Sequence, residues 1–158
     1  MSLSFLNLFE AAALIGESEL LETRLFEVLG RSATVAVDPE KVLLLSVSSR
    51  RHGDLAKSFG NRLPVSASIP TDAFRSVATP EGRAILATLD DEHLEGLDDN
   101  GLLFYLSGEV VPLLARFYED FLVSTSPTSD GPVRVVLDEA LAILEAEIDL
   151  FGALETLR

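Results

Sequence analysis

The chain has 158 residues, and its 12 Lys and Arg against 26 Asp and Glu give a formal net charge of −14. A field of this sign repels the phosphate backbone that supplies most of the affinity for nucleic acid, so the charge argues against a nucleic-acid-binding protein. The sequence contains no cysteine, which excludes disulfides, thiolate nucleophiles, iron–sulfur clusters and zinc–thiolate sites.

Hydrophobic residues make up 47% of the sequence, yet charges or glycines interrupt each apolar stretch before the roughly 20 residues that a membrane-spanning helix needs. The start of the chain lacks the basic segment of a signal peptide and carries Glu10, Glu17 and Glu19. A chain of this length fits one domain. We therefore expect residues 1–158 to form a single soluble, cytoplasmic domain that does not bind a membrane.

Residues 3–29 have the apolar period of a helix, with Leu21 on its main apolar stripe. The helix is predicted to end at Gly30, because glycine accepts the left-handed C-terminal conformation most readily. The opposite side is also apolar, for example at Phe9. Such a helix is covered on two sides, either by neighbours in a bundle or by a partner subunit.

The second predicted helix begins at Asp38 and Pro39, which suit the N-cap and the first turn, and it runs to about Gly60. Only a short segment separates it from the first helix, so the two are expected to be antiparallel neighbours. His52 is the unusual residue here, because the helical period places it on the same face as Leu45.

A looser pattern with three prolines follows at residues 63–98. Short helical pieces are predicted at 71–77 and 79–89, each opened by a threonine that can cap it. The segment is interpreted as a long, partly helical connection.

The third predicted helix covers about residues 100–123. Its period points Ser107 into the core and places Tyr118 at an edge of the buried face. Pro112 lies inside this helix and removes one backbone hydrogen bond, which predicts a kink.

The fourth predicted helix covers about residues 132–157, and Glu147 falls near the middle of its apolar face. A buried carboxylate without a partner is costly, so Glu147 needs a partner or a proton. If the long connection crosses the length of the molecule, Glu147 and His52 lie at similar depths and are expected to meet.

A short loop, a long crossover and a second short loop predict an all-α four-helix bundle with up-down-down-up topology, the crossover lying between helices two and three. This topology resembles that of the ferritin-like superfamily. The resemblance covers nearly the whole chain as topology and only part of it as motif.

The resemblance implies where a metal site would lie. Diiron members of the superfamily take a Glu from helix one, a Glu-x-x-His from helix two, a Glu from helix three and a second Glu-x-x-His from helix four. In this chain "SRRH" keeps His52 and has Ser49 in place of the carboxylate, while "EIDL" keeps Glu147 and has Leu150 in place of the histidine. The third helix aims no Glu at the core.

These residues predict a degenerate site. The candidate metal ligands are His52, Glu147 and one glutamate of the first helix, of which Glu17 matches the depth of His52 better than Glu22 does. Two bridged irons need bridging carboxylates that this set lacks, so an intact diiron centre is not expected. The alternative to a metal site is a hydrogen-bonded polar cluster inside the core.

Two hypotheses about function follow. In the first, a ferritin-like bundle with a degenerate site holds no metal and acts through its surface as an accessory or interaction protein, as a homodimer or with a protein partner. In the second, the protein is a metalloprotein or oxidoreductase that holds one iron or manganese at His52, Glu147 and a first-helix glutamate. The other histidine, His93, lies in an acidic run that is typical of a solvated loop.

Overall fold

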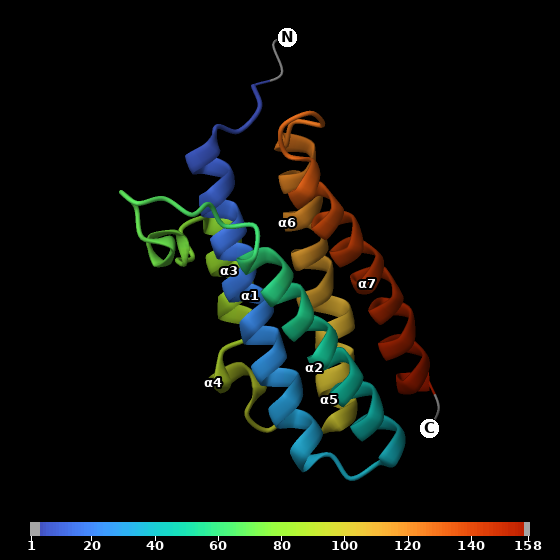
Figure 1. The fold of residues 1–158 in the computed structure, drawn as a ribbon. Coiled ribbons are helices and arrows are strands. Elements are labelled where there is room, and N and C mark those ends of the chain that lie inside the picture. Colours follow the sequence, from blue (N-terminus) through green and yellow to red (C-terminus); the bar gives the residue numbers. More distant parts are fainter. Residues whose placement is uncertain (1–3, 157–158) are drawn as a thin grey trace.

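The computed structural model describes residues 4–156, and these contain helices and no strand, so the all-α prediction is confirmed (Figure 1). Four helical stretches are long, and the third of them, residues 99–124, is a continuous run of three elements. Three short helical pieces lie between the second and third long stretches. The elements in chain order are α1 (Leu8–Val35), α2 (Pro39–Gly60), η1 (Thr71–Phe74), α3 (Pro80–Thr88), α4 (Asp91–Leu94), α5 (Asp99–Tyr105), η2 (Leu106–Val110), α6 (Val111–Ser124) and α7 (Gly131–Thr156).

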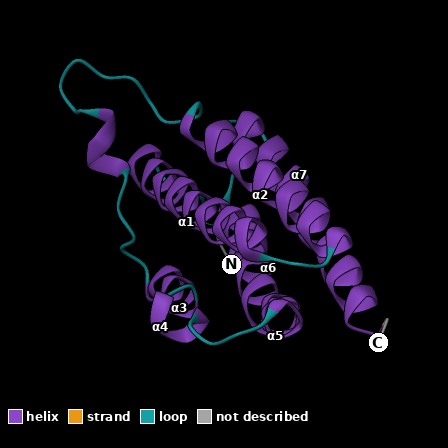
Figure 2. Ribbon diagram, turned by 90° about the horizontal axis from the view of Figure 1, so that it is seen from below, coloured by secondary structure: helices purple, strands orange, loops and turns teal. Residues whose placement is uncertain are grey.

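The four long stretches lie side by side, and their directions can be followed by colour in Figure 1. The chain descends in α1, returns upward in α2, is brought back to the lower end by the crossover, ascends through α5, η2 and α6, and descends in α7. Figure 2 shows α3 and α4 to one side of the long helices. No helix among residues 4–156 is long and apolar enough to cross a bilayer.

The start of α1 is set by a capping box. The Asn7 side chain accepts a hydrogen bond from the Glu10 backbone N–H, and the Glu10 carboxylate accepts one from the Asn7 N–H. At the other end the helix continues past Gly30 to Val35, so the prediction that it ends at Gly30 was wrong. A Cβ at Gly30 would lie 3.1 Å from Ser49 Oγ, so this glycine serves the close approach of α2 rather than helix termination.

The start of α2 is as predicted: Asp38 caps it by accepting from the Glu40 N–H, and Pro39 occupies the first turn. Further along α2, the Ser49 hydroxyl donates a 2.9 Å hydrogen bond to the backbone carbonyl of Phe26. This bond fixes the register of α2 on α1.

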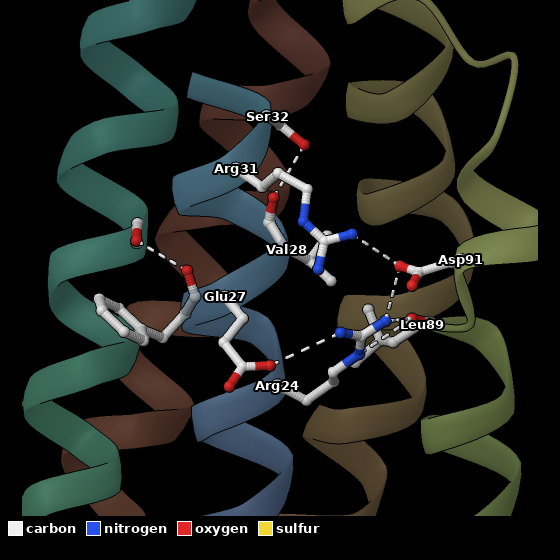
Figure 3. Close-up of polar contacts among 9 residues, drawn as sticks. Arg24, Glu27, Val28, Arg31, Ser32, Leu89 and Asp91 are labelled. Atoms are coloured by element: carbon white, nitrogen blue, oxygen red, sulfur yellow. Dashed lines mark hydrogen bonds and ion pairs between the residues drawn. The ribbon is translucent and has the colours of Figure 1, made fainter. Parts of the chain in front are cut away.

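Two arginines of α1 hold the crossover against this helix through hydrogen bonds and ion pairs (Figure 3). Arg24 donates to the backbone carbonyl of Leu89 and to the Asp91 carboxylate, and Arg31 donates to the same carboxylate at 2.9 Å. Hydrogen bonds from Arg24 and Arg31 lower the pKa of Asp91. The end of α3 and the start of α4 are thereby held against the outer side of α1.

The irregularity predicted at Pro112 takes the form of a π-helical turn, Leu106–Val110, which ends two residues before the proline. Proline has no N–H to give the preceding turn, and a wider turn accommodates the missing bond. The extra residue in that turn changes the helical phase, so Ser107 is half-buried and bonds to the Phe104 carbonyl instead of pointing into the core. The prediction for Ser107 was therefore wrong.

One tight contact between α1 and the crossover yields a stability prediction. A Cβ at Gly16 would lie 1.9 Å from the Phe74 carbonyl oxygen, whereas a Cβ at Gly152 in α7 would meet nothing within 4 Å. Gly16→Ala is expected to lower the free energy of unfolding by about 1 to 3 kcal/mol through overpacking. Gly152→Ala is expected to be neutral or to stabilise by up to about 1 kcal/mol. Urea unfolding measures both, and equal effects of the two substitutions would contradict the contact.

Candidate functional site

The central polar group of the molecule is the imidazole of His52, which is fully buried between two carboxylates. Its Nδ1 lies 2.5 Å from Glu22 Oε2, and its Nε2 lies 2.9 Å from Glu147 Oε2. Neither carboxylate is exposed to solvent. Because the two ring nitrogens point in different directions, the carboxylates lie on opposite edges of the ring.

Tyr118 extends the arrangement to the remaining long helix. Its hydroxyl donates a 2.5 Å hydrogen bond to Glu22 Oε1 and is itself completely buried. The four side chains form one chain of contacts, which we call the core cluster: Tyr118, Glu22, His52 and Glu147. Each of α1, α2, α6 and α7 contributes one member, so the cluster links all four long helices.

Apolar neighbours hold the cluster in place. On α1 Leu21 and Leu25 flank Glu22, and on α7 Leu144 and Phe151 flank Glu147, all of them buried. The residues of the cluster therefore occupy ordinary core positions of amphipathic helices, at which the helical period alone would place apolar side chains.

The electrostatics favour a charged histidine. Burial by itself lowers the pKa of His52, but the negative charge of Glu22 and the hydrogen bonds to Glu147 and Glu22 outweigh it and raise this pKa to about 10. At neutral pH the ring is therefore an imidazolium, and both of its N–H groups donate to carboxylates. Charge-assisted bonds of this kind are about twice as strong as neutral ones.

Tyr118 stays neutral under the same conditions. Burial, followed by the charge of Glu22 and the hydrogen bond to it, raises the pKa of Tyr118 well above 10. The hydroxyl is thus a donor to Glu22 and not a phenolate that would repel it.

Two buried oxygens in this region have no hydrogen-bond partner: Oε1 of Glu147 and Oγ of Ser48, one turn before His52 on α2. An unpaired buried carboxylate oxygen is costly. It is the one point at which the core cluster is chemically incomplete.

The side chains of the core cluster are closed off from solvent. Four pockets on the described part of the chain are lined by other residues. The largest, about 850 Å³, is an open groove between α1 and α2 that Phe26, Gly30, Ser49 and Gly53 help to line. The crossover lines a separate pocket of about 340 Å³ with Val28 and Leu94, away from His52. The four side chains of the core cluster are thus buried and lie outside these four pockets.

The structure brings together two of the three predicted site residues. His52 and Glu147 are in contact, as the depth argument expected. Glu17 is buried but lies elsewhere: its Oε1 accepts hydrogen bonds from the backbone N–H and the hydroxyl of Thr79, at 3.2 and 2.5 Å. It anchors the start of α3 to α1, and Glu22 is the first-helix carboxylate that meets His52.

Tyr118 is the member of the cluster that the sequence reasoning missed, since the residue was expected at an edge. The signal was present in the spacing of Leu114, Tyr118 and Phe121, which are four and three residues apart and share one helix face. All three side chains are buried.

The residues do not fit a diiron centre. Ser49 bonds to the Phe26 carbonyl, Leu150 is 43% exposed, and the residue of the third long helix at this level is a tyrosine. Among residues 4–156 there is no group of three or more His, Cys, Asp or Glu side chains arranged to hold a metal ion. The opposed carboxylates around His52 explain this, because ligands on opposite ring edges do not converge on one point.

Comparisons of the chain with protein-family models, with curated proteins and with solved structures found no match.

Proposed function

We propose that this protein is a ferritin-like four-helix bundle that lacks an intact diiron centre and acts as an accessory or interaction protein, through its surface and not through its core. The observation that carries the proposal is the occupancy of both ring nitrogens of His52 by the carboxylates of Glu22 and Glu147. A ring engaged on both edges holds helices together and has no free nitrogen for a metal or a substrate.

The course of the chain supports the ferritin-like assignment. The second and third long helices run in the same direction and are joined by residues 61–98, which include η1, α3 and α4. One long crossover between helices two and three is the connection that ferritin-like bundles use. The core cluster lies at the level where the sequence motifs would place a metal site.

The burial of the core cluster supports a function carried by surface residues. Several large apolar side chains of α1, α2 and the turn between them are exposed, including Phe26, Val37 and Leu43. Exposed apolar side chains of this kind are available for protein–protein contact. A homodimer or another protein is the expected partner.

The second candidate function is a single iron or manganese site. The unpaired, buried Oε1 of Glu147 favours it, because a cation would satisfy this oxygen. Glu147 and Nε2 of His52 would be the protein ligands, and the ring would have to give up its hydrogen bond to Glu147. Glu22 lies at the other edge of the ring and could not join them.

Elemental analysis separates the two candidates. The protein is purified without chelator or a metal-binding tag, then incubated with ferrous iron or manganese and desalted. We expect no stoichiometric metal in the wild type, and the same metal content in His52→Ala. About one metal per chain, lost in folded His52→Ala, would instead establish the metalloprotein.

A further inference from the structure

An exposed stripe of residues runs along α2 on the side away from the core cluster. Its members, which we call the α2 stripe, are spaced alternately three and four residues apart: Glu40, Leu43, Val47, Arg50, Asp54 and Lys57. Leu43 is 66% exposed and Val47 is 38% exposed. This spacing is that of a helix face which packs against another helix, and in a single copy no helix covers it.

The stripe borders the groove between α1 and α2. The Phe26 ring lies over Gly53, since a Cβ at Gly53 would be 3.0 Å from the ring. Phe26 is 45% exposed, and Val37, just before α2, is 89% exposed. Apolar side chains therefore lie both along the stripe and beside it.

The charge of α2 sets it apart from the rest of the molecule. Apart from the buried His52, it carries four Lys and Arg side chains and two carboxylates, whereas α7 carries one Arg and six carboxylates. Two copies of a chain with a net charge of −14 repel each other over most of their surfaces. Of the four long helical stretches, α2 is the one with more Lys and Arg than Asp and Glu, so its face lacks the net negative charge that repels a second copy elsewhere.

The stripe is also complementary to itself. Consider an antiparallel pair of α2 helices whose two-fold axis crosses the helices at the level of residue 45. In this pair Leu43 of each copy faces Val47 of the other. In the same register Glu40 faces Arg50, twice. Shifting the pair so that Arg50 faced Asp54 would place Val47 opposite Lys57 and lose the apolar contact.

We propose that two copies of this chain associate through the α2 stripe in that antiparallel register, with Val37 of each copy entering the groove beside Phe26 and Gly53 of the other. The inference rests on the proposed function, for which it names the surface and the partner. Leu43 and Val47 form the buried centre of the interface. The two pairs between Glu40 and Arg50 form its rim and set the register.

Sedimentation equilibrium of the full chain tests the interface. We expect the wild type to sediment at twice its chain mass of 17.1 kDa at micromolar concentrations. Leu43→Glu is expected to give a monomer at the same concentrations. Val135→Glu, at an apolar position of α7 that is 65% exposed, is the matched control and is expected to remain a dimer.

Charge reversal tests the register. Glu40→Arg alone and Arg50→Glu alone are each expected to weaken the dimer at least tenfold, because each places like charges opposite one another. The double variant re-pairs them and is expected to return to within a few-fold of the wild-type dissociation constant. Far-UV circular dichroism checks that each variant is folded. Glu139→Arg, at an exposed position of α7, is the control for a change of net charge.

A monomeric wild type, a dimer that Leu43→Glu leaves intact, or a double variant as weak as the single ones would each overturn the inference. None of these outcomes depends on metal. The dimer and the metal-free core can therefore fail independently: metal binding lost in His52→Ala would refute the proposed function, and these outcomes would refute only the interface.

Discussion

Replacing His52 by alanine is expected to lower the free energy of unfolding by about 3 to 5 kcal/mol, a large part of the stability of a domain of this size. The imidazolium is the positive member of the core cluster, and it donates to both Glu22 and Glu147. Without it, two carboxylates stay buried with no cation between them. Glu147 loses the donor that the structure gives it, while Glu22 keeps only the Tyr118 hydroxyl.

Urea unfolding followed by circular dichroism measures this loss, with the slope of unfolding free energy against urea expected to match that of the wild type. His93→Ala is the matched control, because His93 is exposed on α4, and it is expected to change stability by less than about 0.5 kcal/mol. A loss of under about 1 kcal/mol in His52→Ala would contradict a charged, doubly bonded histidine.

A second variant separates the unpaired charges from the cavity that alanine leaves. Glu22→Leu, His52→Leu, Tyr118→Phe and Glu147→Leu together remove every polar atom of the core cluster. Replacing a whole buried ion cluster by apolar side chains is often neutral or stabilising, so this fourfold variant is expected to be more stable than His52→Ala. The opposite order would show that packing around the ring, and not charge, dominates the cost.

The helical period was sufficient to find His52 and Glu147, because a polar residue on an apolar face stands out against a regular pattern. It favoured Glu17 over Glu22, whereas the structure places Glu22 against His52. Both are buried, and which one meets His52 depends on where α1 begins and on how far it slides along α2. The register is set by the contact of Ser49 with the Phe26 carbonyl and with Gly30, which is a tertiary feature with no local signal.

Tyr118 escaped prediction for a related reason. A helix with one neighbour buries a narrow stripe, and Phe117 and Phe121 already fill such a stripe on α6. Tyr118 lies on a second buried side of α6, because its hydroxyl donates to Glu22 on α1 and its ring packs against Phe59 on α2, with the ring centroids 5.5 Å apart. The spacing of Leu114, Tyr118 and Phe121 marked this side of the helix, but the neighbours that cover it, α1 and α2, are set by the tertiary arrangement.

Gly30 and Pro112 show how one residue type can serve two structural roles. Glycine ends helices, and it also permits two helices to approach closely; at Gly30 the second role holds. Proline disrupts a helix, but the disruption at Pro112 is absorbed by a π turn. In both cases the residue type predicts a local irregularity of the helix. The packing of the neighbouring helix, or the shape of the neighbouring turn, determines which irregularity forms.

The stability of the protein is expected to fall as pH rises from about 7 to 10, opposite to the behaviour of an ordinary paired carboxylate. The pKa of His52 is raised from 6.5 to about 10 in the folded protein. Below the unfolded value both states bind the proton and the stabilisation is fully present. Between the two values only the folded state holds the proton, so the folding equilibrium constant falls up to about tenfold per pH unit.

Few other side chains titrate in this window. The sequence has no cysteine and only one other histidine, and His93 is exposed. Tyr118 acts in the same direction only at higher pH, because its pKa in the folded protein lies well above the value of 10 at which it ionises when unfolded. The difference between the wild type and His52→Ala over pH 7 to 9 therefore isolates the contribution of His52.

Urea unfolding at pH 6, 7, 8 and 9 measures the slope, and His52→Ala at the same pH values is the control. The wild type is expected to lose stability steadily from pH 7 to 9, while His52→Ala, already weaker, stays nearly level, so the two curves converge as pH rises. A wild type that is level or gains stability over this range would mean that the buried ring is neutral. A neutral ring donates through one nitrogen only, and one of the two carboxylates would then have to carry the other proton.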